Sequence, residues 1–113
     1  MSATLTRRIA RIKQRITDLG PVHPGRITRQ YNVCGTPGCR CKDPEHPRKH
    51  GPYHNLSYTF RGQSRTLFVR RECVAEMQRR TERYVQLKKL FDELVEASVG
   101  LARREVLEHH EKT

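Results

Sequence analysis

Residues 34–41 read CGTPGCRC and hold three of the four cysteines of a 113-residue chain. The spacing is C-x4-C-x-C, and two glycines and a proline stand between the sulfurs. Glycine and proline favour tight turns, so this segment can fold back and bring three thiols together. A disulfide would leave one cysteine over, and Cys39 and Cys41 are too close along the chain for an easy bridge. The pattern therefore favours a metal site.

Zinc is the ion that such a ligand set suits, because it binds four sulfur or nitrogen ligands in a tetrahedron. Three ligands are predicted to be Cys34, Cys39 and Cys41. His50 is the predicted fourth, because it precedes Gly51-Pro52, which turns the chain into the next strand. Four protein ligands leave no position for water, so the predicted Zn2+ is structural and the protein is predicted not to be an enzyme.

Other residues compete for the fourth position. His46 is the second candidate and His54 the third. Cys73 falls on the apolar side of a predicted helix, where a cysteine commonly serves as a small core residue. The spacing alone leaves His50 and His46 open.

Three segments around the cysteines alternate between apolar and polar residues, which is typical of half-buried β-strands. They are RITRQYNV (26–33), YHNLSYTF (53–60) and RTLFVR (65–70). The last two form a predicted hairpin, with a short turn at RGQS, residues 61–64. The apolar side chains expected to share the inner parity of these strands are Ile27, Tyr31, Val33, Leu56, Tyr58, Phe60, Leu67 and Val69.

Helical periods flank the strands. In residues 1–20, apolar residues recur every three or four positions, and Gly20-Pro21 ends the helix. A similar period continues from residue 71 to about 108, with Gly100 as a kink or an early end. The predicted fold is α+β, in a single domain over 1–113. Its parts are a short basic amphipathic helix (1–20), a zinc-stapled three-stranded antiparallel sheet (26–70) and a long C-terminal helix (71–108).

The long helix is predicted to need a partner. About 37 helical residues would extend about 55 Å, which exceeds the width of a small domain. The partner is either a second copy, in a homodimer, or the first helix, in an intramolecular antiparallel pair. The residues predicted at a dimer interface are Met77, Tyr84, Leu87, Phe91 and Leu94.

The formal net charge of +11 is concentrated in the first part of the chain. Residues 1–70 hold 14 Lys/Arg and 3 Asp/Glu, whereas residues 71–113 hold 9 of each. Such a charge favours a polyanion such as nucleic acid. No apolar run approaches the roughly 20 residues that cross a membrane, and no signal peptide is visible. A cytoplasmic protein without a membrane partner is therefore expected.

The outward face of the sheet is the predicted nucleic-acid surface. Its hydroxyl and amide groups can contact base edges, and arginines around them can contact phosphates. A three-stranded sheet followed by a helix is also similar to the arm-type DNA-binding domains of tyrosine recombinases, a fold analogy that favours duplex DNA. RNA stays an open alternative, although no RNP-like aromatic motif argues for it. The predicted contact residues are Arg26, Thr28, Arg29, Gln30, Asn55, Ser57, Thr59, Arg61, Arg65 and Arg70.

The segments C-G-T-P-G-C-R-C, H-G-P-Y, L-S-Y and R-G-x-x-R-T-L-F-V, followed by a long charged helix, resemble an uncharacterised prokaryotic family. Its small members occur largely in phage and mobile-element settings. The resemblance covers roughly residues 25–98 and implies the same metal set, with His50, but no established activity. This chain departs from the pattern in its longer loop, KDPEHPRK, which keeps His46 in contention, and in His54-Asn55, where aromatic residues are expected.

The sequence thus predicts a non-enzymatic, zinc-containing nucleic-acid-binding protein, an accessory factor of a recombinase or transposase. No H-E-x-x-H, P-loop or C-x-x-C motif points to catalysis. The alternative is a protein-interaction adaptor, in which the helices are the working surface. Its charge would then dock it on a ribonucleoprotein or an acidic protein partner.

Overall fold

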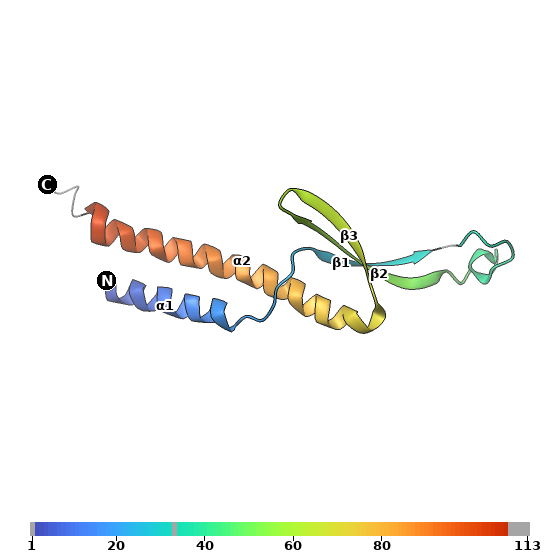
Figure 1. The fold of residues 1–113 in the computed structure, drawn as a ribbon, viewed down its shortest axis with the longest axis horizontal. Coiled ribbons are helices and arrows are strands. Elements are labelled where there is room, and N and C mark those ends of the chain that lie inside the picture. Colours follow the sequence, from blue (N-terminus) through green and yellow to red (C-terminus); the bar gives the residue numbers. More distant parts are fainter. Residues whose placement is uncertain (1, 33, 109–113) are drawn as a thin grey trace. The chain divides into compact units, whose positions relative to one another are not determined.

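The computed structural model describes residues 2–32 and 34–108 (Figure 1). It has the predicted α+β order: a short helix, a three-stranded antiparallel sheet and a long helix. The chain divides into two compact units. The helical unit comprises the described residues of 1–22 and 82–113, and the sheet unit comprises those of 23–81.

The helical unit pairs α1 (Ser2–Asp18) with the part of α2 (Val74–Ala102) that follows residue 81. Its buried core contains one residue of α1 and two of α2. The core residues are Ile12, Leu90 and Ala97, with Ile9, Ile16, Leu19 and Leu94 packed against them. This is the intramolecular helix pair, one of the two alternatives for the partner of the long helix.

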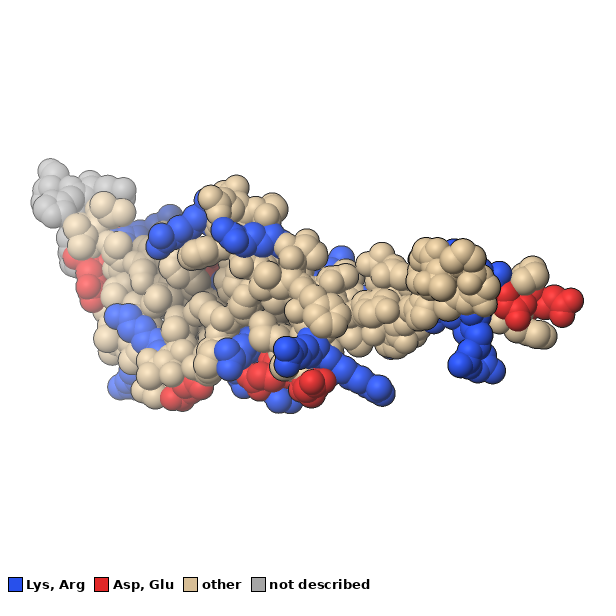
Figure 2. Space-filling view, turned by 45° about the vertical axis from the view of Figure 1, so that its right-hand side comes forward, with Lys and Arg blue, Asp and Glu red and all other residues tan. Residues whose placement is uncertain are grey.

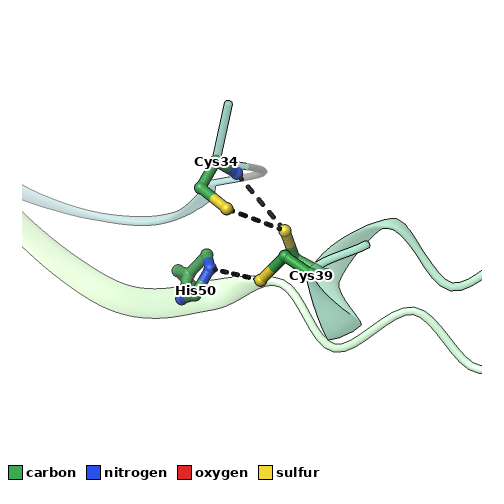
Figure 3. Close-up of side chains that lie close together, drawn as sticks. Cys34, Cys39 and His50 are labelled. Carbon is green, nitrogen blue, oxygen red and sulfur yellow. Dashed lines mark hydrogen bonds between the residues drawn. The ribbon is translucent and has the colours of Figure 1, made fainter. Parts of the chain in front are cut away.

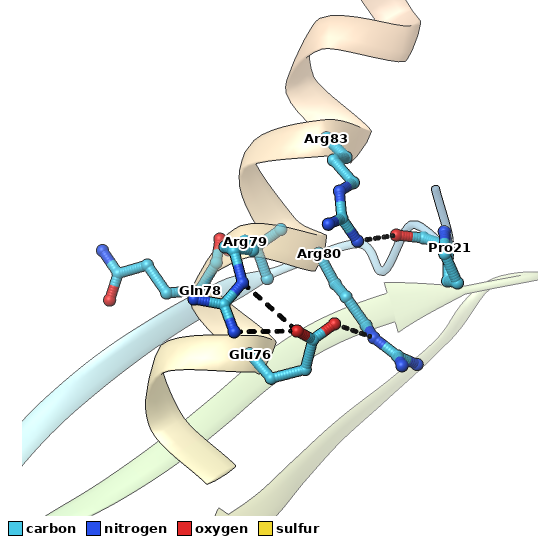
Figure 4. Close-up of polar contacts among 7 residues, drawn as sticks. Pro21, Glu76, Gln78, Arg79, Arg80 and Arg83 are labelled. Carbon is cyan, nitrogen blue, oxygen red and sulfur yellow. Dashed lines mark hydrogen bonds and ion pairs between the residues drawn. The ribbon is translucent and has the colours of Figure 1, made fainter. Parts of the chain in front are cut away.

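The two helices of this unit run antiparallel. Gly20, just after α1, lies beside the Arg83 side chain, whereas Gly100, near the end of α2, lies closest to Leu5. The Arg83 guanidinium also donates a hydrogen bond to the Pro21 carbonyl, at 3.2 Å (Figure 4). The apolar side of α1 therefore packs against α2 along most of α1.

The buried side of α2 differs from the predicted one. Leu90 is 2% exposed, whereas the neighbouring Phe91 is 58% exposed. The apolar residues predicted at the interface, Phe91 among them, share Leu94 with the observed core but do not include Leu90 and Ala97. Several apolar residues on neighbouring helix positions made the two alternatives hard to separate by period alone.

The long helix has an irregular beginning and end. A 3-10 turn, Arg71–Cys73, precedes α2, and a π-helical segment, Arg103–Leu107, follows it. The helix continues through Gly100, which excludes the early end, one of the two alternatives at this position. Among the residues that the structure describes, no helix is both long enough and apolar enough to span a bilayer.

The sheet unit contains β1 (Arg26–Asn32), β2 (His50–Phe60) and β3 (Gln63–Val69), with β2 in the centre. β2 begins three residues earlier than predicted, at the candidate ligand His50. The register between β1 and β2 shifts after Gln30. This irregularity interrupts the alternation of side chains, and Tyr31 is exposed rather than inward as predicted. Val33 lies outside the described residues.

The hairpin turn contains two residues rather than the four that were predicted. Phe60 pairs with Gln63, and Ser64 lies within β3, so only Arg61 and Gly62 form the loop. Both have positive φ, 52° and 78°. Positive φ at both positions is the type I′ geometry, whose twist matches that of the paired strands.

The inner face of the sheet is buried only in part. Leu56 and Val69 are buried as predicted. Phe60 and Leu67 lie on this face, as predicted from their parity, but both are exposed, Phe60 to 58%. Phe60 stands beside the hairpin turn and Leu67 lies on an edge strand, where fewer neighbours cover a side chain.

Within the sheet unit, His23 connects the inner face of the sheet to the first turns of α2. Its backbone N–H donates to the Arg80 carbonyl at 3.0 Å, and its ring meets the Tyr58 ring edge-on, with 4.7 Å between centroids. The Glu76 carboxylate accepts hydrogen bonds from Arg79 and Arg80, at 3.0 Å and 2.8 Å (Figure 4). The His23 contacts join the linker before β1 to the first turns of α2 within the sheet unit, and the Glu76 ion pairs lie within those turns.

Candidate metal centre and nucleic-acid interface

Three cysteines and a histidine lie close together (Figure 3). They stand at the start of β2, whereas the hairpin turn follows the end of that strand. The ligand atoms of Cys34, Cys39, Cys41 and His50 all lie within 4.8 Å of one another. The Sγ atoms of Cys34 and Cys41 are 3.5 Å apart, and Cys39 Sγ is 3.2 Å from His50 Nε2. Ligands of a tetrahedral zinc ion are about 3.5–3.8 Å apart, given the usual Zn–S and Zn–N bond lengths. The two measured separations lie near this range, so the four residues could hold one metal ion.

A tight turn in the cysteine segment brings the sulfurs together. A 3-10 turn, Arg40–Lys42, follows Cys39, and the Lys42 N–H donates to the Cys39 carbonyl at 3.0 Å. This turn carries Cys41 back toward Cys34, whose backbone N–H donates to Cys41 Sγ at 3.3 Å. Cys41 is the buried member of the group. The short C-x-C spacing thus serves to fold two sulfurs into one site.

The fourth member reaches the site through a backbone conformation that requires glycine. Gly51 follows His50 and has φ 130°. A Cβ at Gly51 would lie 2.8 Å from the Gln30 carbonyl oxygen, which is too close for any other residue. This close approach of β2 to β1 places the His50 ring against Cys39.

The competing residues lie outside this group. His46 is exposed, and its backbone N–H donates to the Asp43 carboxylate at 3.2 Å. His54 lies within β2 opposite Val69, and Cys73 is exposed at the start of the long helix. The structure therefore brings together the same four residues that the sequence favoured.

Two of the four pKa shifts in the group favour a bound cation, and two favour the protonated side chain. The backbone N–H of Thr36 lowers the pKa of Cys34 to about 6, and the backbone N–H of Cys41 lowers the pKa of Cys39. Burial raises the pKa of Cys41. Hydrogen bonds to the sulfurs of Cys34 and Cys39 raise the pKa of His50. Adjacent thiolates are the donors that Zn2+ prefers, and a bound cation stabilises their negative charge.

The second candidate site is the face of the sheet opposite to Leu56, which we call the polar face. The register places Arg26 beside Ser57, and Ser57 beside Thr66. The residues of the polar face are Arg26, Thr28, Gln30, Tyr53, Asn55, Ser57, Thr59, Ser64, Thr66 and Phe68.

Six of the ten predicted contact residues lie on this face, and four do not. Arg29 and Arg65 pair with His54 and Tyr58, which places them on the opposite face. Arg61 forms part of the hairpin turn, and Arg70 follows β3. The six are Arg26, Thr28, Gln30, Asn55, Ser57 and Thr59.

Two aromatic residues of the polar face were missed from the sequence. Phe68 is 65% exposed and pairs with Asn55, and Tyr53 is exposed opposite Gln30. The signal was available for Phe68, since it stands between Leu67 and Val69, which were assigned to the inner parity.

Polar side chains on this face contact one another across the strands. The Asn55 amide donates to Gln30 Oε1 at 3.3 Å, and the Ser57 and Thr66 hydroxyls are 3.3 Å apart. A shallow hollow nearer the turn is lined by residues of the polar face and by two residues of the opposite parity, Tyr58 and Arg65. The polar-face residues, with the adjoining Gly25, are Gly25, Arg26, Ser57, Thr59, Ser64 and Thr66. An arginine beside several hydroxyls can bind an anion such as a phosphate group.

The sheet unit is strongly basic. Its segment, residues 23–81, holds 12 Lys/Arg against 4 Asp/Glu, a net charge of +8. Figure 2 shows basic and acidic side chains together at its right-hand end, where the loop of the metal cluster lies. In residues 40–49 of this loop, two acids partly offset four basic residues. A positive field over the sheet unit attracts polyanions and raises their association rate.

The predicted dimer residues lie along α2 with unequal exposure. Phe91 is exposed, whereas Tyr84, Leu87 and Leu94 are half-buried. Met77, also half-buried, belongs to the sheet unit. The outer side of the helix carries further exposed apolar residues, Val95 and Val99 among them.

Comparison with protein families finds one described as a domain of unknown function, DUF6788, which matches residues 2–79. The match includes α1, the whole sheet and all four residues of the metal cluster. Neither the curated proteins nor the solved structures gave a match to the chain. Since the matched segment makes up more than half of its length, the chain belongs to the DUF6788 family.

Proposed function

We propose that this protein binds nucleic acid without catalysing a reaction, that its metal cluster holds a structural Zn2+, and that duplex DNA is its ligand. The observation that carries the proposal is the polar face itself. Six side chains able to contact bases or phosphates lie on one side of a sheet unit with a net charge of +8.

Zinc would act here through folding. The cluster joins the end of β1 to the start of β2, and its four residues would complete the tetrahedron around a bound ion. Binding of the ion to the folded chain alone adds its binding free energy to the stability of the sheet. The chain has a small core, with six buried apolar residues among those described, so such a contribution matters.

The polar face supplies the two kinds of group that DNA recognition uses. Arg26 can contact a phosphate, which contributes affinity without sequence preference. The amides of Gln30 and Asn55 can donate to and accept from base edges, which contributes sequence preference. Both kinds of group lie within one exposed surface.

The setting we propose is that of an accessory factor for a recombinase or transposase in the cytoplasm. Support comes from the resemblance of the cysteine and H-G-P-Y segments to proteins found largely in mobile elements, and from the sheet-then-helix order shared with arm-type domains. A homodimer through the exposed side of α2 would present two sheet units to one DNA molecule.

The same exposed helix surface supports the alternative, a protein-interaction adaptor. Phe91, Val95 and Val99 are spaced by four residues, so they form one apolar stripe on α2, and all three are exposed. In an adaptor this stripe binds the partner protein, and the basic sheet unit docks on an acidic surface.

A salt series separates the two functions. The zinc-loaded protein is titrated into fluorescently labelled duplex DNA, and anisotropy gives the affinity at each salt concentration. We expect affinity to fall steeply with salt, because neutralised phosphates release counterions. Arg26→Ala should reduce the logarithmic salt slope by about 0.9, the value for one phosphate contact.

Arg29→Ala is the matched control, since it removes the same charge from the opposite face of the sheet and Arg29 does not line the hollow. We expect it to leave the slope nearly unchanged. Absence of binding at low salt would favour the adaptor. Equal effects of the two substitutions would show general charge attraction rather than a contact at the polar face.

A further inference from the structure

The most exposed aromatic ring on the sheet belongs to Phe68, and packing within the protein does not account for its position. Phe68 is 65% exposed on the polar face, on the edge strand β3 beside Asn55. Exposed aromatic rings that stand among hydrogen-bonding and basic groups are typical of surfaces that bind bases by stacking. Phe68 therefore calls for a ligand rather than for a place in the core.

Phe68 has an aromatic neighbour on the same face. Tyr53 lies two residues before Asn55 on β2, so Tyr53 and Phe68 are diagonal neighbours across β2 and β3. Diagonal neighbours on one face of a sheet are about 7–8 Å apart. Bases in a duplex rise by about 3.4 Å per step. Two successive bases can thus reach both rings only if they are unstacked from each other.

We infer that Tyr53 and Phe68 stack on unpaired bases, and that the preferred ligand is DNA in which a single-stranded segment adjoins a duplex. This inference rests on the proposed function and specifies the form of the DNA. In an intact duplex the faces of the bases are covered by their neighbours, so these rings would have nothing to stack on.

The surroundings of the two rings fit the other parts of a nucleotide. The Gln30–Asn55 amide pair lies beside both rings, within reach of the edge of a stacked base. Toward the hairpin turn, the hollow that contains Arg26 and Ser57 offers positive charge and hydroxyl groups to a phosphate. Base face, base edge and phosphate each meet a suitable group on one surface.

Phe60 provides a matched control. It is also an exposed phenylalanine on the same hairpin, 58% exposed, but it points to the opposite face of the sheet. Phe60→Ala therefore removes the same apolar area from the same unit without altering the polar face. Since both rings are exposed, neither substitution should unfold the protein.

The test uses the full, zinc-loaded chain and two labelled probes: a short duplex, and the same duplex with a single-stranded thymine tail. We expect the tailed probe to bind the wild-type protein more tightly. Phe68→Ala should weaken binding to the tailed probe about five- to hundredfold, the range measured for the loss of one base–aromatic stack. Phe68→Ala should leave binding to the blunt duplex within about twofold. Phe68→Trp, which keeps an aromatic ring, should keep the preference for the tailed probe.

The outcomes separate this inference from the proposed function. Equal affinity for both probes, or equal effects of Phe68→Ala and Phe60→Ala, would overturn the stacking inference while leaving DNA binding in place. No binding to either probe would overturn the proposed function. A tail-dependent complex lost in Phe68→Ala, without binding to the blunt duplex, would support stacking and exclude duplex DNA as the ligand.

Discussion

Cys39 Sγ lies 3.2 Å from His50 Nε2, although ten residues separate them along the chain. The contact closes the loop that joins β1 to β2, and Cys34 and Cys41 complete the group around it. A zinc ion held by these four residues would fix the open end of the sheet. The polar face, on the same two strands, would gain rigidity from that bond.

The metal content is the first prediction. Purified protein should contain about one zinc per chain, and Cys39→Ser should lose it, because three ligands hold the ion far more weakly than four. Chelation should lower the melting temperature of the wild-type protein, since the ion stabilises only the folded state. Elemental analysis and thermal denaturation measure the two effects.

Cys73→Ser is the control for the metal, because Cys73 is exposed and lies outside the cluster. It should keep both the zinc and the melting temperature. A metal-free wild-type protein whose stability is unchanged in excess chelator would contradict the site.

The affinity for zinc should depend on pH, with a sign that follows from the pKa shifts. At pH 7, Cys34 is largely a thiolate, because its pKa is about 6. Cys41 and His50 have raised pKa values, so zinc must displace protons from them. Affinity should therefore rise with pH above 7, and fall more steeply below pH 6, where Cys34 also becomes protonated. Competition with a chromophoric chelator measures this, and a flat profile from pH 6 to pH 8 would disprove it.

The hairpin turn makes a prediction about stability. Arg61 and Gly62 both adopt positive φ. Gly62→Ala should destabilise the protein by about 1 kcal/mol, because a Cβ is unfavourable in that conformation. Arg61→Asn should be neutral or stabilising, since asparagine is favoured in type I′ turns. Chemical denaturation of both variants decides it, and equal stability of Gly62→Ala and wild type would rule out this turn.

The packing of the helical unit makes a prediction that distinguishes neighbouring residues. Leu90 is 2% exposed in the core with Ile12, whereas Phe91 is exposed. Leu90→Ala should cost about 2–5 kcal/mol of stability, as for other buried leucines. Phe91→Ala should cost less than about 0.5 kcal/mol at protein concentrations too low for association. Reversed costs would mean that α1 covers the other side of α2.

Association through the long helix is tested separately. We expect the wild-type protein to be a homodimer at micromolar concentration, and Phe91→Ala to weaken it, because Phe91 is the most exposed of the residues predicted at the interface. Light scattering gives the mass of each. A monomer mass for the wild-type protein would exclude the dimer and leave the intramolecular pair as the whole assembly.

The sequence predicted the elements of this fold better than their details. Alternation and helical periods found three strands and two helices, because both patterns reflect local geometry. The two-residue length of the turn was not predicted, because Gln63 and Ser64 are typical turn residues and yet pair within β3. The sequence also did not predict which side of α2 is buried, because only contact with α1 decides between Leu90 and Phe91.

The candidate sites show the same division. The clustered cysteines predicted a metal site through short-range spacing, and His50 joins them only because β2 pairs with β1 at close range. The polar face needed the strand register as well. Register places Arg65 on the opposite side and Phe68 among the amides, and neither position follows from charge or composition.

The contact surface itself provides the most direct test of the account. The zinc-loaded, isotopically labelled protein is titrated with the tailed duplex, and backbone amide chemical shifts are followed by NMR. We predict the largest changes at Arg26, Asn55 and Phe68, and little change along Ser2–Asp18 or in α2 after residue 82. Changes confined to the two helices, or none at saturating DNA, would contradict the assignment of the sheet as a nucleic-acid surface.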